Sequence, residues 1–507
     1  MGSSGNEMSI PDKCTVLVIG GGPGGSYTAA VLAREGIDTV LLEAEKFPRY
    51  HIGESMLPSI RHYLRFIELD EVFNKHGFTK KVGAAFKMIP HHREGFTDFI
   101  AADKNHYSWN VIRSEADELI FRHAAASGAK AVDGVKVNSI EFAKSDVDPG
   151  RPVSASYTRK DDGTTGVIKF DYVVDASGRV GVLNTKYLKN RHYNTALKNV
   201  ANWAYYRGTG SYSKDPTRQN TPFFEALTDE SGWAWFIPLH DGTTSVGVVR
   251  NQAIAARKKT ESGLSTTEFF EDSLKFCPNL VGLISAGQRV TEVKAASDYS
   301  YHSSSYGFPY ARVVGDAGCF IDPFFSSGVH LAMTGGLSAA TTIAASLRGD
   351  VDEATAAQWH TSKVREGYAR FLLVVLSAYK QMMNQSEPVL SDYNEDNFDR
   401  AFSFFRPVIQ GTVDVSGKEV SGKLTQAEFS KTIDFLAKAF DPKIIDGSAT
   451  DGAEGEARKL TEEDLEALRT IRTHHGAAVL NIDNFTTDVV DGRVPRLERG
   501  QLTLVQV

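Results

Sequence analysis

Near the N-terminus, apolar runs alternate with a glycine-rich turn in the pattern of a βαβ unit. Residues 14–19 form a short, β-branched apolar run that predicts a buried strand. The run Gly20-Gly21-Gly22-Pro23-Gly24-Gly25 follows. Residues 26–34 then show an Ala- and Leu-rich helical pattern, and a second apolar run at 39–42 ends at Glu43. This order predicts two strands that flank one helix.

Further along the chain, hydrophobic periodicity predicts a mixture of helices and strands. Helical spacing of apolar residues covers residues 54–75, 114–126 and 331–347. Strand patterns occupy residues 82–89, 97–101, 152–175 (a hairpin), 199–250 and 311–315. Aromatic residues at helical spacing predict a mainly helical region over 353–439, followed by a linker near 445–460, a helix near 461–470 and an irregular tail.

Composition narrows the class of protein. The 507 residues are 41% hydrophobic and 23% charged, as in ordinary globular proteins. A net charge of -7, without a basic stripe, argues against nucleic-acid binding. No run of 18 apolar residues predicts a membrane span, and the N-terminal residues lack a signal-peptide pattern. Three scattered cysteines predict neither disulfides nor a metal site, so we expect a cytoplasmic protein without a metal.

The glycine-rich turn carries the first chemical signal, a G-x-G-x-x-G motif. Gly20 makes the tight turn, Gly22 lets the main chain approach a pyrophosphate, and Gly25 allows close packing of helix and strand. Glu43, at the end of the next strand, is placed to accept hydrogen bonds from a ribose. The motif predicts a dinucleotide site and does not separate NAD from FAD.

Later motifs favour FAD. Val313-Val314-Gly315-Asp316 is a strand that ends in Gly-Asp, and the chain here resembles the FAD-dependent monooxygenase and halogenase superfamily. The resemblance implies that Asp316 holds the ribityl chain, that Arg113 contacts the flavin, and that Gly53 and Ser55 lie in a flavin-proximal strap. Pro23 belongs to the phosphate turn. Helix N-capping by Asp316 is the alternative interpretation, and both roles are compatible.

The resemblance implies an α/β fold of the glutathione-reductase-like type, with a Rossmann-type FAD domain, a β-sheet substrate domain and a helical C-terminal region. The expected division is 8–190 (FAD-binding, with inserted strands near 82–106), 191–300 (substrate-covering sheet), 301–350 (FAD-binding) and 351–507 (helical). A second G-x-G-x-x-G is absent from the sequence. Either a separate reductase delivers FADH2, or NAD(P)H binds transiently.

Two motifs resemble the flavin-dependent halogenase family. Residues 233–238 match W-x-W-x-I-P, in which Trp233 and Trp235 share one face of a strand and, with Pro238, screen the flavin from the substrate. Residues 78–83 match F-x-x-K-x-G, and this spacing makes Lys81, rather than Lys80, the catalytic lysine. Core tryptophans and a solvated surface lysine are the structural alternatives.

A third motif follows Asp316. The family places halide against main-chain amides of the loop at residues 322–328, and Ser327 and Gly328 match those positions. Amides at the start of a helix form a natural anion site. An ordinary N-cap by a serine is the alternative.

Phe325 departs from the tryptophan halogenases, which carry a glutamate at this position. A phenol needs less activation than an indole, so Phe325 favours an electron-rich phenolic substrate. We expect Phe324 and Phe325, with parts of residues 360–410, to line a flat pocket. The motifs resemble fungal halogenases of phenolic polyketides, the radicicol halogenase group, and favour a free small molecule over a carrier-bound one.

The combined hypothesis is a halogenase that uses FADH2, O2 and chloride or bromide. Hypohalous acid passes the two tryptophans to Lys81, which directs halogen to the ring. A single-component FAD-dependent aromatic hydroxylase is the main alternative. A flavin reductase of isoprenoid double bonds and an inactive flavin-binding regulator are further alternatives.

Overall fold

The computed structural model describes residues 9–101, 103–144, 149–194, 197–297, 300–386 and 489–507. The predicted linker near 445–460 and the predicted helix near 461–470 lie outside the described residues, as does much of the helical region expected to run to 439. No helix in the described ranges has both the length and the apolar character that crossing a membrane requires.

The first sheet is the predicted Rossmann-type sheet. Its order is β19 (Gly307–Phe308), β20 (Ala311–Val313), β10 (Thr165–Asp175), β1 (Lys13–Ile19), β2 (Thr39–Leu42) and β7 (Lys130–Val132). Outside this order, β9 (Pro152–Arg159) pairs with β10, and β8 (Val135–Phe142) pairs with β9. The central pairs from β20 to β7 are parallel, and β9 and β10 form the predicted antiparallel hairpin. Continuous burial of β1 and β2 accounts for their apolar runs.

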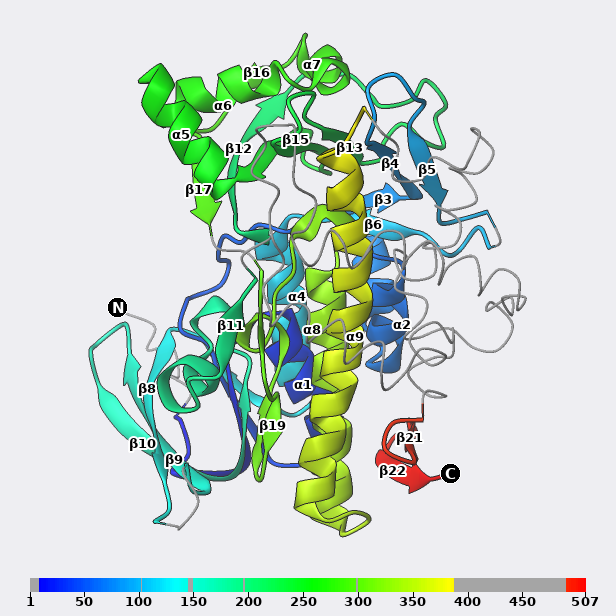
Figure 1. Ribbon diagram of the computed structural model, residues 1–507. Helices are drawn as coiled ribbons and strands as arrows, with labels where there is room; N and C mark the ends of the chain where they lie inside the picture. Colours follow the sequence, from blue (N-terminus) through cyan, green and yellow to red (C-terminus); the bar gives the residue numbers. More distant parts are fainter. Residues whose placement is uncertain (1–8, 102, 145–148, 195–196, 298–299, 387–488) are drawn as a thin grey trace, which may run out of the picture.

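Helices cover this sheet and link it to the second one. They include α1 (Pro23–Arg34), α4 (Arg113–Ala126), α8 (Gly328–Arg348) and α9 (Glu353–Met382). The small residues of α8 allow it to pack closely against α1. Figure 1 shows α9 running the length of the molecule, from the second sheet past the first.

The second sheet contains most of the strand-rich region. Its order is β16 (Gln288–Arg289), β12 (Asn199–Arg207), β15 (Thr243–Asn251), β14 (Gly232–Pro238), β13 (Phe223–Ala226), β4 (Gly83–Lys87) and β5 (Gly95–Asp98), while β17 (Lys294–Ser297) pairs with β12. The predicted inserted strands therefore join this sheet through the parallel pair β13–β4. Three helices pack against this sheet, at the top and upper left of Figure 1: α5 (Gln252–Ser262), α6 (Thr266–Leu274) and α7 (Pro278–Ile284).

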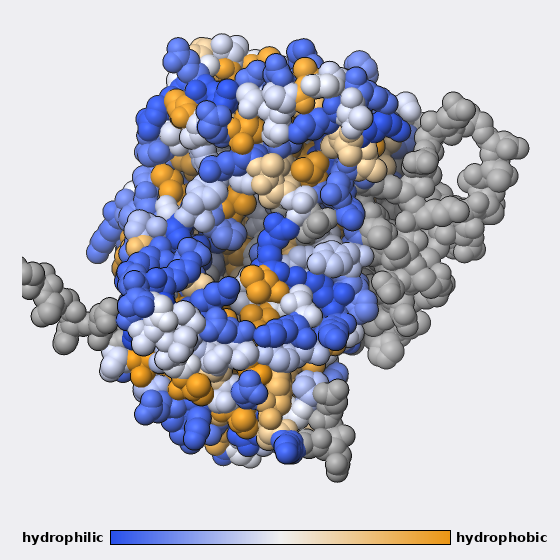
Figure 2. Space-filling view, turned by 90° about the vertical axis from the view of Figure 1, so that its left-hand side faces the viewer, coloured by the Kyte–Doolittle hydropathy of each residue, from blue (hydrophilic) through white to orange (hydrophobic). Residues whose placement is uncertain are grey.

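Short elements connect the two sheets. They are α2 (Ser59–Phe66), α3 (Asp70–His76) and the two-stranded pairs β3 (Thr79–Lys81) with β6 (Ser108–Asn110) and β11 (Arg191–Tyr193) with β18 (Tyr301–Ser303). The face in Figure 2 is mainly hydrophilic, with small apolar groups, and is hollowed at mid-height.

Two sequence predictions of local structure were wrong. Residues 54–75 do not form one helix, because residues 54–57 run as an extended strap, bridged from Ser55 to Asn110, and α2 and α3 are separate. The described part of the tail, residues 489–507, is not irregular: β21 (Arg493–Arg496) and β22 (Thr503–Gln506) form a hairpin. Leu502 and Leu504 are buried in the core beside α8, and this tertiary burial was not visible as periodicity.

Candidate active site

The predicted flavin motifs meet at one edge of the first sheet. Ile19 of β1 lies beside Leu42 of β2 and Asp175 of β10, and Asp175 lies beside Val313 of β20. The carboxyl ends of these parallel strands therefore share one edge, where ligands bind in open α/β sheets. We call the residues that follow the four strand ends, from Gly20, Glu43, Ala176 and Asp316, the flavin edge.

Gly20 and Gly25 of the glycine-rich turn pack too tightly against main chain for side chains. Gly20 and Gly22 connect β1 to α1, which has Pro23 at its first position. A Cβ atom on Gly25 would lie 1.9 Å from the carbonyl oxygen of Gly20, well inside van der Waals contact. The first turn of α1 thus presses against the end of β1, and its free main-chain N–H groups face the turn.

Glu43 supports the same turn. Its Oε2 accepts a hydrogen bond from the Gly21 amide at 2.5 Å, and its Oε1 accepts one from the Glu45 amide at 2.8 Å. The Nε atom of Arg49 lies 3.8 Å from Glu43 Oε1, and its Nη2 lies 3.6 Å from the Cβ position of Gly22. Sequence reasoning missed Arg49, whose charge faces the phosphate turn.

The strap is held by Arg113, at the first position of α4. The guanidinium donates from Nη1 to the carbonyls of Ile52 (3.0 Å) and Gly53 (3.2 Å). It also makes two hydrogen bonds to Asp117, at 2.8 and 2.9 Å. Burial raises the pKa of Asp117, but the charges of Arg113 and Arg49 outweigh it and hold that pKa below its usual value. Arg113 therefore stays ionised and fixes the strap at the flavin edge.

Asp316 lies opposite Arg113 at this edge. Burial raises its pKa to about 6, against the lowering effect of Arg113, Arg179 and Arg191. No described residue donates a hydrogen bond to its carboxylate, although Tyr301 donates to its main-chain oxygen at 2.6 Å. A carboxylate in such a place needs donors. Ribityl hydroxyls would supply them, so the residues present fit FAD.

Lys81 is buried, whereas its neighbour Lys80 is exposed. The Lys81 side chain, at the end of β3, donates from Nζ to Ser55 Oγ at 2.8 Å and to the Met56 carbonyl at 2.9 Å. The Phe99 ring centroid lies 5.1 Å from Nζ. Among the described residues no carboxylate forms an ion pair with Lys81, and burial alone lowers its pKa to about 7. The strap residue Ser55 therefore contacts the lysine.

Trp233 and Trp235 lie on the same face of β14, with ring centroids 5.8 Å apart. Trp233 Nε1 donates to the Tyr379 hydroxyl at 2.9 Å, and Trp235 Nε1 donates to Ser245 Oγ at 3.0 Å. A Cβ atom at Gly247, directly across from Trp235, would lie 2.2 Å from that indole. The strand β15 thus makes room for the ring. At the end of β14, the carbonyl of Pro238 accepts a hydrogen bond from Asn110 at 3.0 Å.

The loop before α8 ends in Ser327, a buried residue. Its hydroxyl has no hydrogen-bond partner in the described part of the chain, and no serine side chain caps α8. The alternative of an ordinary serine N-cap is therefore not what the structure has. Gly328 opens the helix, and a Cβ there would meet only Phe320, at 4.0 Å. Free amides and a buried hydroxyl at one helix start fit a small anion.

A buried polar group joins this loop to the tryptophans. The Tyr379 hydroxyl, on α9, donates to Asp322 Oδ2 at 2.6 Å and accepts from Trp233. Asn199 donates to both Asp322 Oδ2 and the Tyr379 hydroxyl, at 3.0 and 2.9 Å. Burial raises the pKa of Asp322 to about 6. Sequence reasoning missed this group, because its members lie far apart along the chain.

Phe324 and Phe325 lie in the same core as the tryptophans. Phe324 contacts Trp233 edge-on, with centroids 5.1 Å apart, and both phenylalanines lie 5.3 Å from Phe86. Phe99, which lies beside Lys81, belongs to the same cluster. The structure thus brings Lys81, the tryptophans and the loop before α8 around one aromatic cluster. We call these residues the lysine–tryptophan region.

Glu54 is a further buried acid that sequence reasoning left unassigned, although it lies between Gly53 and Ser55 of the predicted strap. The Tyr205 hydroxyl donates to its Oε1 at 2.5 Å. Burial raises the pKa of Glu54 to about 7, against hydrogen bonds from Tyr205 and Ser245 that lower it. Glu54 lies in the sequence between Gly53, whose carbonyl binds Arg113, and Ser55, which binds Lys81. This position was the signal in the sequence that could have identified it.

Comparison with known proteins agrees with this geometry. A family model described as tryptophan halogenase matches residues 15–102 and 97–403. The chain is 58% identical to the flavin-dependent halogenase ascD of Acremonium egyptiacum, over 98% of this chain and 93% of that protein. It is 52% identical to the sulochrin halogenase gedL of Aspergillus terreus, over 98% and 94%.

A solved structure, the myxobacterial chondrochloren halogenase CndH, described as a variant of FAD-dependent halogenases, has a TM-score of 0.68 to this chain. It is 27% identical and covers 85% of this chain and 97% of its own. The predicted fold class and family are therefore confirmed. The chain belongs to the tryptophan halogenase family, among the fungal flavin-dependent halogenases, and is an FAD-dependent enzyme.

Proposed function

We propose that this halogenase chlorinates, and also brominates, an electron-rich phenolic ring by means of hypohalous acid that is guided to Lys81. The observation that carries the proposal is the burial of Lys81, 1% exposed, without a carboxylate partner among the described residues. A buried lysine with no counter-ion costs stability, so such a group is retained for a chemical role.

The flavin edge would hold FAD through the residues that the sequence assigned to it. These are Gly20, Gly22, Pro23, Gly25, Glu43, Gly53, Ser55, Arg113 and Asp316. When bound in its reduced form, the flavin supplies hypohalous acid from O2 and halide. A separate reductase is the proposed source of FADH2, because the sequence carries one dinucleotide motif.

Ser327 and Gly328 would bind the halide. The Ser327 hydroxyl, which has no hydrogen-bond partner among the described residues, and the amides at the start of α8 would supply donors to an anion. Trp233, Trp235 and Pro238 would separate the flavin edge from the substrate. Both indoles are buried, 1% and 6% exposed, and their bulk would keep water and substrate from the flavin edge.

Lys81 would hold and orient the oxidised halogen. With a pKa of about 7, its side chain is present both as ammonium and as amine near neutral pH. The ammonium can donate a hydrogen bond to hypohalous acid, and the amine can accept halogen to form a haloamine. Ser55 and the Met56 carbonyl accept hydrogen bonds from Nζ and so fix its direction.

A free phenolic, polyketide-type molecule is the proposed substrate. Phe325 stands in place of the family glutamate, and a phenol does not need that group to activate its ring. The 52% identity to a sulochrin halogenase supports this class. We further propose that the region 191–300 covers the substrate, and that Phe324 and Phe325 contribute to its pocket.

One assay tests the proposal against hydroxylation. The protein is incubated with FAD, NADH, a flavin reductase, chloride or bromide, and a panel of resorcinol-type phenols, and products are read by mass spectrometry. We expect halogenated phenol only when reductase and halide are both present. Product that carries oxygen instead of halogen, formed with NADH and no reductase, would establish the single-component hydroxylase.

A further inference from the structure

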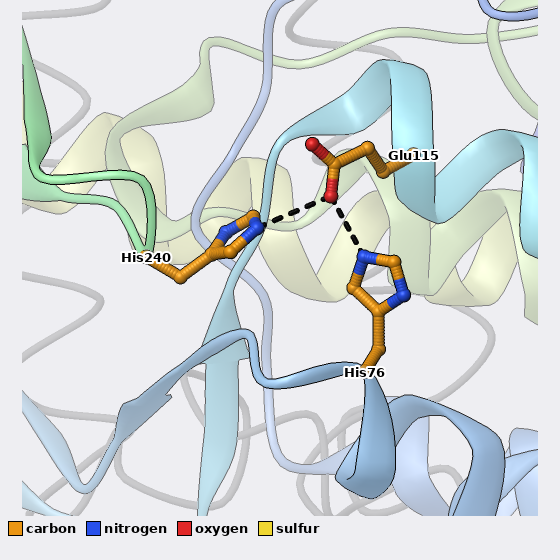
Figure 3. A group of neighbouring side chains, drawn as sticks. All are labelled: His76, Glu115 and His240. Atoms are coloured by element: carbon orange, nitrogen blue, oxygen red, sulfur yellow. Dashed lines mark hydrogen bonds and ion pairs between the residues drawn. The ribbon is translucent and has the colours of Figure 1, made fainter.

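Two histidines and one glutamate converge outside the flavin edge and the lysine–tryptophan region. His76 Nε2 lies 2.7 Å from Glu115 Oε2, and His240 Nε2 lies 3.1 Å from the same oxygen. The three ligand atoms all lie within 4.8 Å of one another. Figure 3 shows both imidazoles pointing at the carboxylate from different sides.

Each residue comes from a different element. His76 is the last residue of α3, Glu115 is in the first turn of α4, and His240 follows the end of β14. The buried Phe78 ring supports both imidazoles, with centroids 4.3 Å from His76 and 5.3 Å from His240. The rings are therefore held in place before any ion binds.

The donor set and its spacing suit a transition-metal ion. Two imidazole nitrogens and one carboxylate oxygen form the two-histidine, one-carboxylate set that holds divalent metals on one face. Around a tetrahedral Zn²⁺ about 2.1 Å from each ligand, the ligand atoms lie about 3.4 Å apart. The two observed nitrogen–oxygen distances, 2.7 and 3.1 Å, are shorter, so the side chains would move apart by about 0.3–0.7 Å to admit the ion.

Hydrogen bonding without a metal is the alternative explanation. A neutral imidazole N–H donates to a carboxylate oxygen at distances like these. Both imidazole nitrogens meet the same oxygen of Glu115, Oε2, which is the convergence expected around a shared ion.

We propose that His76, Glu115 and His240 bind one divalent transition-metal ion, for which Zn²⁺ is the probe. The ion would clamp together the ends of three segments. His76 is followed by Phe78 of the lysine motif, Glu115 follows Arg113, which holds the strap, and His240 follows the strand that carries the tryptophans. The site would therefore stabilise the arrangement of the lysine–tryptophan region without contacting substrate.

Zinc binding to the whole protein tests this site. Untagged, FAD-loaded protein is dialysed against a chelator and titrated with ZnCl2 in a calorimeter, and the bound metal is counted by mass spectrometry. We expect one ion per chain. Loss of a residue that only orients a metal ligand weakens metal binding about 10–100-fold. Glu115→Gln removes a ligand itself, so it should weaken zinc binding at least about 100-fold. Zinc should raise the melting temperature of the wild type and not of Glu115→Gln.

Matched controls separate the site from general surface binding. His91→Ala removes an exposed histidine outside the group, and Glu118→Gln removes a carboxylate on the same helix. Both should keep wild-type zinc affinity, and the FAD spectrum should show that every variant is folded. Equal zinc affinity of Glu115→Gln and the wild type, or no binding by the wild type, would show a hydrogen-bonded histidine–carboxylate group only and would overturn the proposal.

Discussion

The flavin edge and the lysine–tryptophan region are built by different means. The flavin edge consists mainly of main-chain turns at the ends of four neighbouring strands, with contacts such as that between Gly25 and Gly20. The lysine–tryptophan region consists of buried side chains from segments far apart in the sequence. Lys81, Trp233, Ser327 and Tyr379 come from β3, β14, the loop before α8 and α9.

This difference predicts different kinds of failure. At Gly20 and Gly25 of the flavin edge an added side chain meets main chain, so FAD binding and stability should fall together. In the lysine–tryptophan region single polar groups act within an apolar cluster. Their replacement should abolish or redirect chemistry while the flavin still binds.

The largest effect is expected for Lys81→Met, which keeps the volume of the side chain and removes its nitrogen. General acid–base groups contribute about 10²–10⁴-fold, and we expect halogenation to fall by about 10³-fold or more. Product formation is measured by mass spectrometry under reductase-coupled conditions, and FAD binding by absorbance. FAD affinity should not change.

Lys80→Met is the matched control, since Lys80 is exposed and adjoins Lys81. Its activity should stay within about twofold of the wild type, because surface substitutions rarely matter. Equal loss in both variants, or retained halogenation in Lys81→Met, would remove the catalytic role from Lys81.

Next in size is Gly25→Ala at the flavin edge. The added Cβ would lie 1.9 Å from the Gly20 carbonyl oxygen, so the turn must shift. We expect FAD affinity to fall about 100-fold, which corresponds to about 2.7 kcal/mol. Fluorescence titration with FAD measures it. Gly282→Ala on α7, where a Cβ meets nothing within 4 Å, is the control and should bind FAD normally.

The sequence predicted the flavin edge well because its signals are local. A strand, a glycine turn and a helix occupy consecutive residues, and β1, α1 and β2 lie within two residues of their expected bounds, apart from the earlier start of α1 at Pro23. The contact of Gly25 with the Gly20 carbonyl lies within this short window, so one part of the sequence contains both the cause and the effect.

The lysine–tryptophan region was predicted only in its motif residues. Nothing local links Tyr379 on α9 to Asp322 and Trp233, which lie 57 and 146 positions away. The sequence of the strap, residues 54–57, likewise resembles the first turn of a helix. The β-bridge between Ser55 and Asn110 keeps these residues extended instead. Long-range hydrogen bonds of this kind have no periodicity.

A smaller effect is expected for Tyr379→Phe, which removes the hydroxyl shared by Asp322, Trp233 and Asn199. Each unsatisfied buried group costs about 1–3 kcal/mol. We expect a loss of stability in that range and about tenfold slower halogenation, with a raised KM for chloride and unchanged FAD affinity. The chloride dependence of turnover distinguishes this positioning role from general destabilisation.

Tyr206→Phe in β12, outside this hydrogen-bonded group, serves as the control for Tyr379→Phe. It should leave the KM for chloride unchanged. If both variants raise that KM equally, or neither does, the Tyr379 hydroxyl does not position the loop before α8.

The smallest effect concerns pH and compares the two regions directly. At the flavin edge Arg113 is paired with Asp117, whereas Lys81 has no such partner among the described residues. Burial lowers the pKa of Lys81 from its ordinary value of 10.5 to about 7. Between these values the unfolded chain binds more protons at Lys81 than the folded one. The contribution of Lys81 to the free energy of unfolding therefore rises with pH across this window.

Lys81→Met removes that contribution. The free energy of unfolding of Lys81→Met, minus that of the wild type, should therefore be greatest near pH 7 and should decline as the pH rises. From pH 7.5 to 8.5 the difference should shrink by about 1 kcal/mol, since one pKa unit corresponds to about 1.4 kcal/mol. Urea unfolding of the FAD-loaded proteins at both pH values measures it, with Lys80→Met expected to run parallel to the wild type. If the stability of Lys81→Met instead changes with pH as that of the wild type does, the Lys81 ammonium is solvated in the folded protein. The charge of Lys81 would then be stabilised as well as that of Arg113, and the two regions would not differ in this respect.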